Sequence, residues 1–460
     1  MKFVWSLFLA LCAFNVPAAN IGDRLEPFFD DHLIGGMTGD VALHLHRPTP
    51  REVVLVTGEP WEGNTSAYYT IFKDGDKYRM YYRGADWDTE KRKAKHREVT
   101  CYAESKDGIN WLKPKLGLFE FNGSKQNNIV WDGIGTHCFT VFKDANPNAK
   151  AEARYKAISR GRVEKTANRY QSGLFVYQSP DGINWKMIKN EPVILKGAFD
   201  SQNLAFYDTE RGLYVDYHRW FNNGLRDIMT CTSKDYVNWT EPVPLRITEK
   251  KKEHLYTNAI QPYDRAPHLY VGFPTRYLPK QGSRVEPVFM SSRDGLNFNR
   301  WSDPVIPESA PKDRKGNRSN YMAWGLFQLP GKPNEYSVYA SEAYYEGPDS
   351  RLRRFSYRVD GFVSVRGGAE GGKMTTKPIQ FAGKKLVLNY AVKAGGFLSV
   401  QLRHPKTNKV LAVSKPLTDD KIAGVIEWKR GKSVRELAGQ TVRVEFQLKN
   451  ADLYSMQFVK

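Results

Sequence analysis

Two acidic residues, Glu62 and Asp200, stand in short polar stretches of the sequence, each just ahead of an apolar run. The stretches are WEGNTS from residue 61 and FDSQN from residue 199. Hydrolysis of a glycosidic bond ordinarily needs two carboxyl groups, one as acid and the other as base or nucleophile. We therefore predict that Glu62 and Asp200 form the catalytic pair, with Asp86, Asp88 and Glu342 in reserve.

Polar and aromatic residues recur at the same place ahead of later apolar runs. Sugars expose hydroxyl groups, which side chains can hydrogen-bond, and apolar ring faces, against which aromatic rings pack. We predict substrate contacts from Trp61, Asn64, His137, Gln202, Tyr256, Asn258, Tyr321 and Trp324. His137 and His254 could instead hold a metal ion or a water, but a hydrogen-bonded structural role suits each better, so we predict no metal and no cofactor.

An arginine recurs at the end of successive aromatic-rich runs. YYRG, ISRG, YHRW and PTRY supply Arg83, Arg160, Arg219 and Arg276, and YASEAYY breaks the series with Glu342. Guanidinium groups that converge can bind a carboxylate or a sulfate through paired hydrogen bonds. We include these residues and Asp86 in the predicted binding site. The alternative is that each arginine pairs with a local carboxylate as part of the framework.

The elements that would position these residues are marked by a repeat. SKDGINW begins at Ser105 and SPDGINW at Ser179, and weaker copies are SKDYVNW, SRDGLNF and YRVDGFV. An Asp-Gly turn followed by an aromatic residue is typical of a β-hairpin, and five copies at blade-like spacing predict a propeller. We predict an all-β fold with a five-bladed β-propeller over residues 59–366. Strand direction places the Asp-Gly turns on the face away from the predicted site.

The rest of the chain falls into three parts. Residues 1–19 read as a signal peptide cleaved near Ala18 or Ala19, which predicts a secreted or periplasmic protein without stable membrane insertion. Residues 20–58 form a lead segment that caps or closes the ring. GGAEGGK, from residue 367, reads as a glycine-rich linker to a β-sandwich over residues 367–460.

The net charge bears on the kind of partner, and the cysteines bear on disulfide and metal sites. The formal net charge is +19, and export argues against nucleic acid as the partner, so an anionic polysaccharide or an acidic cell surface fits better. Plain solubility is the alternative. Three cysteines remain after cleavage, at wide spacings that predict neither a disulfide framework nor a zinc site. The sequence does not indicate an oligomeric state.

These features resemble the five-bladed propeller glycoside hydrolases of families 32 and 43. Asp200 in FDSQNLAFYDTERGLY matches the family 32 aspartate that heads an innermost strand, and the resemblance implies that it binds sugar hydroxyls. The chain departs from the pattern at Glu62, where those families have aspartate, and at Phe199 and Gln202 beside Asp200. The Glu-Cys acid motif of family 32 is absent, so the catalytic roles do not transfer with the fold.

Sialidases are the second group that the repeat resembles. Their turn motif has one residue between aspartate and glycine, whereas glycine follows aspartate directly here. They use an arginine cluster and a tyrosine nucleophile. The arginine series fits that group, and five blades in place of six do not.

The sequence thus predicts a glycoside hydrolase acting on a polysaccharide or oligosaccharide, anionic chains included, by a two-carboxylate mechanism. A non-catalytic carbohydrate-binding propeller and a sialidase-like exo-glycosidase remain alternatives. Carboxyl groups of Glu62 and Asp200 about 5–10 Å apart across an open site would favour hydrolysis. A separation far beyond that, or burial of either group against an arginine, would favour binding alone.

Overall fold

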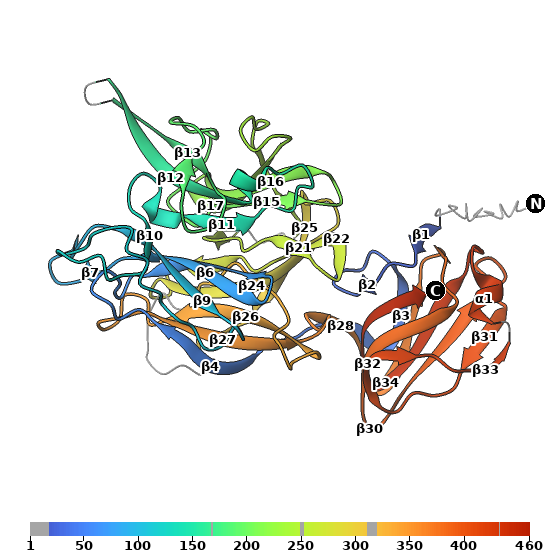
Figure 1. Cartoon of the computed structure of the whole chain (residues 1–460). Helices are drawn as coiled ribbons and strands as arrows, with labels where there is room; N and C mark the ends of the chain where they lie inside the picture. Colours follow the sequence, from blue (N-terminus) through green and yellow to red (C-terminus); the bar gives the residue numbers. More distant parts are fainter. Residues whose placement is uncertain (1–17, 167–168, 249–252, 311–319, 432) are drawn as a thin grey trace, which may run out of the picture. The chain divides into compact units, whose positions relative to one another are not determined.

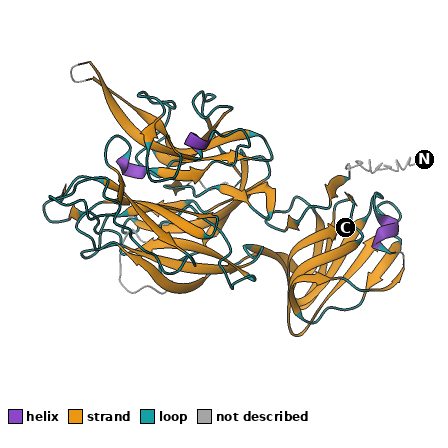
Figure 2. Ribbon diagram, viewed as in Figure 1, coloured by secondary structure: helices purple, strands orange, loops and turns teal. Residues whose placement is uncertain are grey.

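The computed structural model describes residues 18–460 apart from 167–168, 249–252, 311–319 and 432. The fold is nearly all-β, as predicted (Figure 2). The described helices are the 3-10 turns η1 (Thr136–Cys138) and η2 (Ala151–Ala153) and the single-turn α1 (Val434–Leu437). Among the described residues, no helix has the length and apolar character needed to cross a membrane. Residues 1–17, most of the predicted signal peptide, lie outside the described residues.

The described chain divides into two compact units, residues 45–362 and residues up to His44 together with 363–460. The predicted lead segment 20–58 does not form a unit of its own, because it is divided between the two. β3 (Ile34–Leu45) joins the C-terminal sheet, whereas β4 (Thr49–Val56) joins a sheet of the 45–362 unit.

Successive antiparallel sheets build the 45–362 unit (Figure 1). The first three sheets are four-stranded. They contain β5 (Ala67–Asp74), β6 (Lys77–Gly84), β9 (Val99–Ser105) and β10 (Ile129–Trp131); β11 (Thr140–Lys143), β12 (Tyr155–Thr166), β13 (Arg169–Ser179) and β14 (Lys186–Met187); and β15 (Leu204–Asp208), β16 (Leu213–Asn222), β17 (Leu225–Ser233) and β18 (Val243–Pro244). A two-stranded ribbon, β7 (Trp87–Asp88) with β8 (Lys93–Ala94), follows β6.

The remaining sheets of this unit are less regular. The fourth has seven strands, β19 (Arg246–Ile247), β20 (His254–Leu255), β21 (Gln261–Tyr263), β22 (Ala266–Gly272), β23 (Thr275–Leu278), β24 (Arg284–Ser292) and β25 (Asn297–Pro304). The last has β26 (Glu335–Glu342), β27 (Arg351–Arg358) and β4. The propeller-like arrangement is confirmed, and the count of five regular blades stays a prediction.

Tyrosine–aspartate hydrogen bonds join successive sheets. In each case an aspartate near the turn between the first two strands of one sheet accepts from a tyrosine of the next. The pairs are Asp74–Tyr155 (2.7 Å), Asp144–Tyr214 (2.7 Å), Asp208–Tyr270 and Asp264–Tyr336 (2.5 Å). The last sheet is tied to the first, since Tyr339 donates to the Gly108 carbonyl (2.8 Å) and Tyr78 donates to the Gln328 carbonyl (3.0 Å).

The repeated Asp-Gly turns lie at the far end of the strands from Arg83, as predicted. In the first sheet Tyr78 pairs with Ser105 beside the turn, and Gly84 pairs with Val99 at the other end. Within the turn, Asp107 Oδ1 accepts the backbone N–H groups of Ile109 and Asn110, both at 2.8 Å. The turns also join sheets, because the Gly182 carbonyl accepts from Tyr81 of the preceding sheet (2.9 Å).

The other unit is a β-sandwich-like region built on an eight-stranded sheet. It contains β2 (Glu26–Pro27), β3, β28 (Val363–Thr376), β30 (Lys385–Arg403), β31 (Val410–Ser414), β32 (Asp420–Val425), β33 (Trp428–Gly431) and β34 (Arg443–Val459). β1 (Ala19–Gly22) pairs in parallel with β29 (Ile379–Phe381). Its core includes Leu388, Val400, Leu448 and Phe446.

The predicted glycine-rich linker is wrong, because GGAEGGK lies inside strand β28. Strand β28 pairs with β34 across a bulge between Gly367 and Gly372. A Cβ on Gly368 would lie 2.0 Å from an Asp40 carboxylate oxygen, and one on Gly372 would lie 2.2 Å from the Thr38 carbonyl. The glycines are therefore required by close packing and not by flexibility.

Candidate functional site

Arginines and tyrosines from the first three sheets of the 45–362 unit, and tyrosines from its later loops, gather where the second strands end. This arginine–tyrosine cluster comprises Tyr68, Arg83, Glu98, His137, Arg160, Asp200, Arg219, Arg226, Tyr256, Tyr321 and Tyr344. The Arg83 guanidinium lies 4.8 Å from the centre of the Tyr68 ring, and that of Arg219 lies 5.1 Å from the Tyr256 ring. Tyr321 packs edge-on against Tyr256 and Tyr344. The cluster therefore combines cations with aromatic faces.

Tyr68 is placed by a strained backbone. Its φ is +59°, in the left-handed region that bulky residues avoid, and the pairing of β5 with β6 shifts register between Ala67 and Thr70. The bulge turns the Tyr68 ring toward Arg83 and His137, whose ring centre lies 5.7 Å away. Strain of this kind costs about 1–3 kcal/mol and is often found at functional sites.

Arg83 is held in one position by its neighbours. It donates to the Thr65 carbonyl (2.7 Å) and to the Tyr344 hydroxyl (2.9 Å). Its other terminal nitrogen lies 3.5 Å from Glu98. With the side chain only 5% exposed, this arginine is a fixed positive charge at the cluster.

Glu98 and His137 form a hydrogen-bonded pair beside Arg83. His137 Nδ1 lies 3.0 Å from Glu98 Oε2, and we assign the Nδ1 proton to this bond. Burial raises the pKa of the Glu98 carboxyl, but the hydrogen bond from His137 and the charges of Arg83 and Arg160 outweigh it and lower the pKa to about 2. Burial lowers the pKa of His137, so its imidazole is neutral near pH 7.

Asp200 and Arg219 form a second ion pair of the cluster. The Asp200 side chain is 54% exposed, whereas that of Arg219 is 5% exposed. Arg219 also donates to the Ala198 carbonyl (3.1 Å). Burial lowers the pKa of Arg219, but the guanidinium remains a cation at neutral pH. Asp200 thus offers an accessible carboxylate on a fixed guanidinium, where the sequence predicts a catalytic one.

Glu62 lies inside the protein and not at the cluster. Its side chain is fully buried, and its carboxylate accepts from Tyr82 (2.5 Å) and Lys113 (2.6 Å). Burial raises the pKa of Glu62, and the charge of Lys113 offsets part of that rise. These contacts favour a structural role for Glu62 and leave Asp200 as the exposed member of the predicted pair.

Eight other predicted contacts bond within the framework. Arg276 pairs with Glu253 and Glu286, so the predicted arginine series loses its fourth member. The remaining bonds join Trp61 to Asn128, Asn64 to Trp87, Asp86 to Lys95, Gln202 to Tyr69, Asn258 to Tyr217, Trp324 to Ile260 and Glu342 to Arg353. The reserve candidate Asp88 pairs with the exposed Lys91.

Four members of the cluster, Tyr68, Glu98, Arg226 and Tyr344, are absent from the predicted site. The two charged ones lie next to the start of a third strand, Glu98 before β9 and Arg226 in β17. A third strand begins beside the end of the second, so Glu98 comes next to Arg83. Strand direction therefore places the starts of third strands at the same end of the sheets as the starts of first strands and the ends of second strands, from which the site was predicted.

A surface pocket of about 320 Å³ adjoins the cluster. It is lined by residues that include Glu253, His254, Tyr277 and Lys280. The Arg226 guanidinium lies 4.9 Å from the Tyr277 ring and 5.0 Å from the Tyr256 ring. His254 Nδ1 accepts the backbone N–H of Arg226 (3.2 Å), which gives this histidine a structural hydrogen bond, as predicted.

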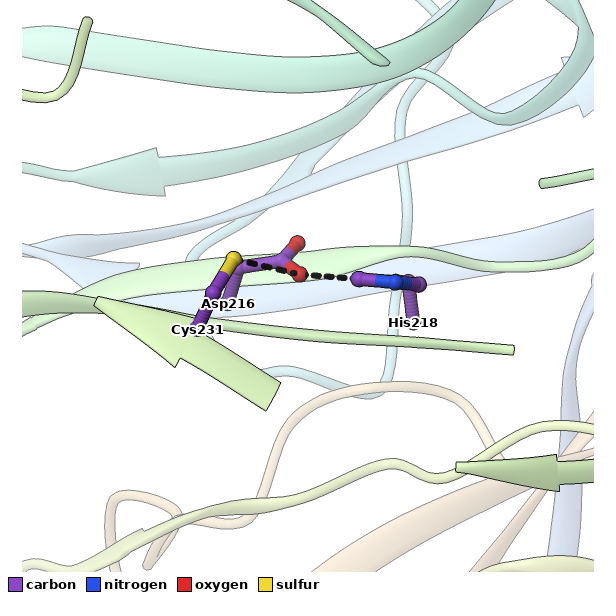
Figure 3. A group of neighbouring side chains, drawn as sticks. All are labelled: Asp216, His218 and Cys231. Atoms are coloured by element: carbon purple, nitrogen blue, oxygen red, sulfur yellow. Dashed lines mark hydrogen bonds and ion pairs between the residues drawn. The ribbon is translucent and has the colours of Figure 1, made fainter. Parts of the chain in front are cut away.

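Of the described residues, one group has the types and spacing of metal ligands, namely Asp216, His218 and Cys231 (Figure 3). All three side chains are buried. Cys101 and Cys138 are also free and buried.

No protein-family model and no curated protein matches the chain. Similar solved structures include a glycoside hydrolase, with 14% identity and a TM-score of 0.48 over 68% of this chain and 92% of that one. A Bombyx mori GH32 beta-fructofuranosidase has 9% identity and a TM-score of 0.44, over 91% and 94%. The catalytic domain of a Coprinopsis cinerea GH62 alpha-L-arabinofuranosidase has 10% identity and a TM-score of 0.46, over 68% and 97%. The chain is thus similar to glycoside hydrolases at low identity, the group that its sequence resembles.

Proposed function

We propose that the chain is a glycoside hydrolase that acts on an anionic saccharide at the arginine–tyrosine cluster. One observation carries the proposal. Four guanidinium groups, those of Arg83, Arg160, Arg219 and Arg226, gather there beside tyrosine rings, against two carboxylates, Glu98 and Asp200. The excess cations fit a sulfate or uronate group, and the rings fit sugar faces. A five-bladed propeller and export after loss of residues 1–19 belong to the same proposal.

Asp200 is the carboxylate that we assign to the reacting sugar. It is exposed and paired with the Arg219 guanidinium, and an accessible carboxylate can serve as a nucleophile or general base. The second proton-transfer group is the Glu98–His137 pair. Glu98 fixes the imidazole through Nδ1, and no hydrogen bond to His137 Nε2 is found within the described residues. Nε2 is therefore free to exchange a proton with substrate or water.

One observation favours a second reaction, β-elimination from a uronic acid. The Glu98 carboxyl has a lowered pKa and not the raised pKa of a glycosidase acid, whereas His137 is neutral and adjoins fixed arginines. The arginines would neutralise the uronate carboxylate, and His137 would take the proton at C5. The electron pair would form the C4–C5 double bond as the C4–oxygen bond breaks, and a tyrosine such as Tyr68 would protonate the leaving oxygen.

The test is a screen of the full chain against sulfated, uronate and neutral glycans, with two readouts. Hydrolysis gives reducing ends without the ultraviolet absorbance of a C4–C5 unsaturated uronate, and elimination gives both. Asp200→Asn should lower the rate of hydrolysis about 100-fold or more. Near-normal hydrolysis by this variant would remove Asp200 from the mechanism.

Binding separates the enzyme from a non-catalytic propeller. Arg226→Gln should weaken binding of anionic glycans and spare neutral ones. Lys332→Gln, at the opposite end of the strands and paired with Glu335, is the charge-matched control and should bind as the unmodified protein does. Tight binding with neither product would assign the chain to carbohydrate binding alone.

A further inference from the structure

Asp216, His218 and Cys231 share one face of the third sheet. Asp216 and His218 alternate along β16, so their side chains point to the same side, and Cys231 of β17 lies directly opposite Asp216. Their ligand atoms all lie within 4.8 Å of one another. Figure 3 shows the Asp216 carboxylate between the thiol and the imidazole. An Asp-x-His pair in a strand with a cysteine across from it thus places three metal-ligating side chains together.

The hydrogen bonds of His218 orient its ring as a metal ligand requires. Nε2 lies 2.9 Å from the Lys196 carbonyl oxygen, which can only accept, so Nε2 carries a proton. Nδ1 faces Asp216 Oδ1 and shares a proton with it, and a metal ion would replace that proton. Metal-bound histidines commonly donate their other ring N–H to a backbone carbonyl in this way.

The three groups are buried, and among the described residues the charged partner of Asp216 is His218. Asp216 and His218 have no exposed surface, and Cys231 is 3% exposed. Asp216 Oδ2 makes no hydrogen bond, and Oδ1 accepts from the Cys231 thiol at 3.7 Å. Among the described residues, neither Asp216 nor Cys231 has a lysine or arginine partner. Burying a carboxylate without a cation costs several kcal/mol.

We propose that Asp216, His218 and Cys231 bind one divalent transition-metal ion, with zinc as the best fit. Thiolate, imidazole and carboxylate together suit zinc, which prefers nitrogen and sulfur ligands in tetrahedral geometry. A thiolate and a carboxylate carry two negative charges, which one divalent ion balances, so the buried site stays neutral. A water molecule would complete the four ligands.

Such a site would stabilise the part of the third sheet that positions Arg219 and Asp200. Arg219, which holds Asp200, follows His218 in β16, and the His218 ring packs 5.2 Å from the Phe199 ring, next to Asp200 in sequence. Because the ligands are buried, the ion would stabilise the third sheet and would not touch substrate. The proposal is independent of the glycoside hydrolase assignment.

The experiment loads the purified full chain with Zn²⁺ or Co²⁺ and measures bound metal per chain after gel filtration. We expect one ion per chain, a thiolate-to-cobalt charge-transfer band, and a higher Tm with Zn²⁺ than after chelation. Cys231→Ser should remove the band and weaken binding by at least about 100-fold. Cys101→Ser, which replaces another buried thiol, should keep both.

The cobalt spectrum of the unmodified chain decides the matter even if Cys231→Ser fails to fold. Bound cobalt without a thiolate band would overturn the proposal, as would metal binding that survives Cys231→Ser. The absence of metal after loading would leave the trio as a hydrogen-bonded network between Asp216 and His218. Asp216→Asn serves as the second ligand variant and should also lose the ion.

Discussion

At the residue scale, burial decides which carboxylates can do chemistry. Glu62 and Asp200 look alike in sequence, each a polar residue ahead of an apolar run. Lys113 and Tyr82 enclose the first, and the second reaches solvent. The three-dimensional neighbours that make this difference come from distant parts of the chain, so no local pattern could have separated the two.

Glu62→Gln should destabilise the fold. The change leaves the Lys113 ammonium beside an uncharged amide, and removing one partner of a buried pair costs about 3–5 kcal/mol. Urea unfolding measures the loss, and Lys113→Met in the same chain should restore part of it. A Glu62→Gln protein of normal stability would show that the pair contributes little.

The rate of β-elimination, the reaction in which His137 is the base, should rise with pH through the titration of His137. The imidazole acts as a base only when neutral, and burial lowers its pKa below 6.5, so activity should fall only in acid. Glu98 raises the pKa of His137, so Glu98→Gln should move the acid limb of kcat/KM to lower pH. His137→Gln should remove that limb together with most of the activity. An acid limb that stays in place in Glu98→Gln would exclude His137 as the titrating group.

At the element scale, the repeat predicted the hairpins because turn chemistry is local. Asp107 binds the N–H groups two and three residues ahead of it, which fixes the turn from a seven-residue segment. The same segment gives no sign that the Gly108 carbonyl accepts from Tyr339, 231 positions away. The seven strands of the fourth sheet and the strand through GGAEGGK also depend on partners outside the local sequence.

Asp74 should make the contact between the first two sheets sensitive to acid. It accepts from Arg79 (2.6 Å), Lys143 (2.7 Å) and Tyr155 (2.7 Å). Burial raises the pKa of Asp74, but these three partners together lower it to about 2. The folded-state pKa lies below the unfolded value, so the stabilisation is complete above about pH 4 and is lost as the pH falls toward 2.

Asp74→Asn should therefore cost about 3 kcal/mol at pH 7 and little at pH 2. Asp76→Asn is the matched control, because Asp76 is an exposed aspartate two residues away. Thermal unfolding between pH 2 and 7 measures both. Equal pH profiles for the two variants would contradict the role of Asp74.

At the scale of the whole molecule, the two units were only partly predictable. Composition and hairpin spacing predicted a propeller followed by a sandwich, and the chain is nearly all-β, as that prediction requires. Nothing in residues 20–58 shows that β3 pairs with β28 and β4 with β27, because strand pairing between chain ends leaves no short-range signal.

β4 should be needed for a stable 45–362 unit. It pairs along β27, with Leu55 opposite Leu352, and its absence would expose that edge. Residues 45–362 produced alone should unfold in one cooperative transition. Residues 57–362 should unfold at a lower temperature and aggregate. Equal melting and solubility of the two would show that β4 is dispensable.

The pairing of β4 with β27 also limits when the 45–362 unit can finish folding during synthesis. Arg51 Nε reaches Ser356 Oγ at 2.9 Å across 305 positions of sequence, and Gln457 Nε2 reaches the Asp23 carbonyl at 2.9 Å across 434. A chain made from its N-terminus can complete the 45–362 unit only after β27 has been made, and the other unit only after β34 has been made. Residues 49–56 stay without their partner strand, β27, while the sheets between them in sequence form. Long-range closure of this kind slows folding and leaves strand edges open to aggregation in the nascent chain.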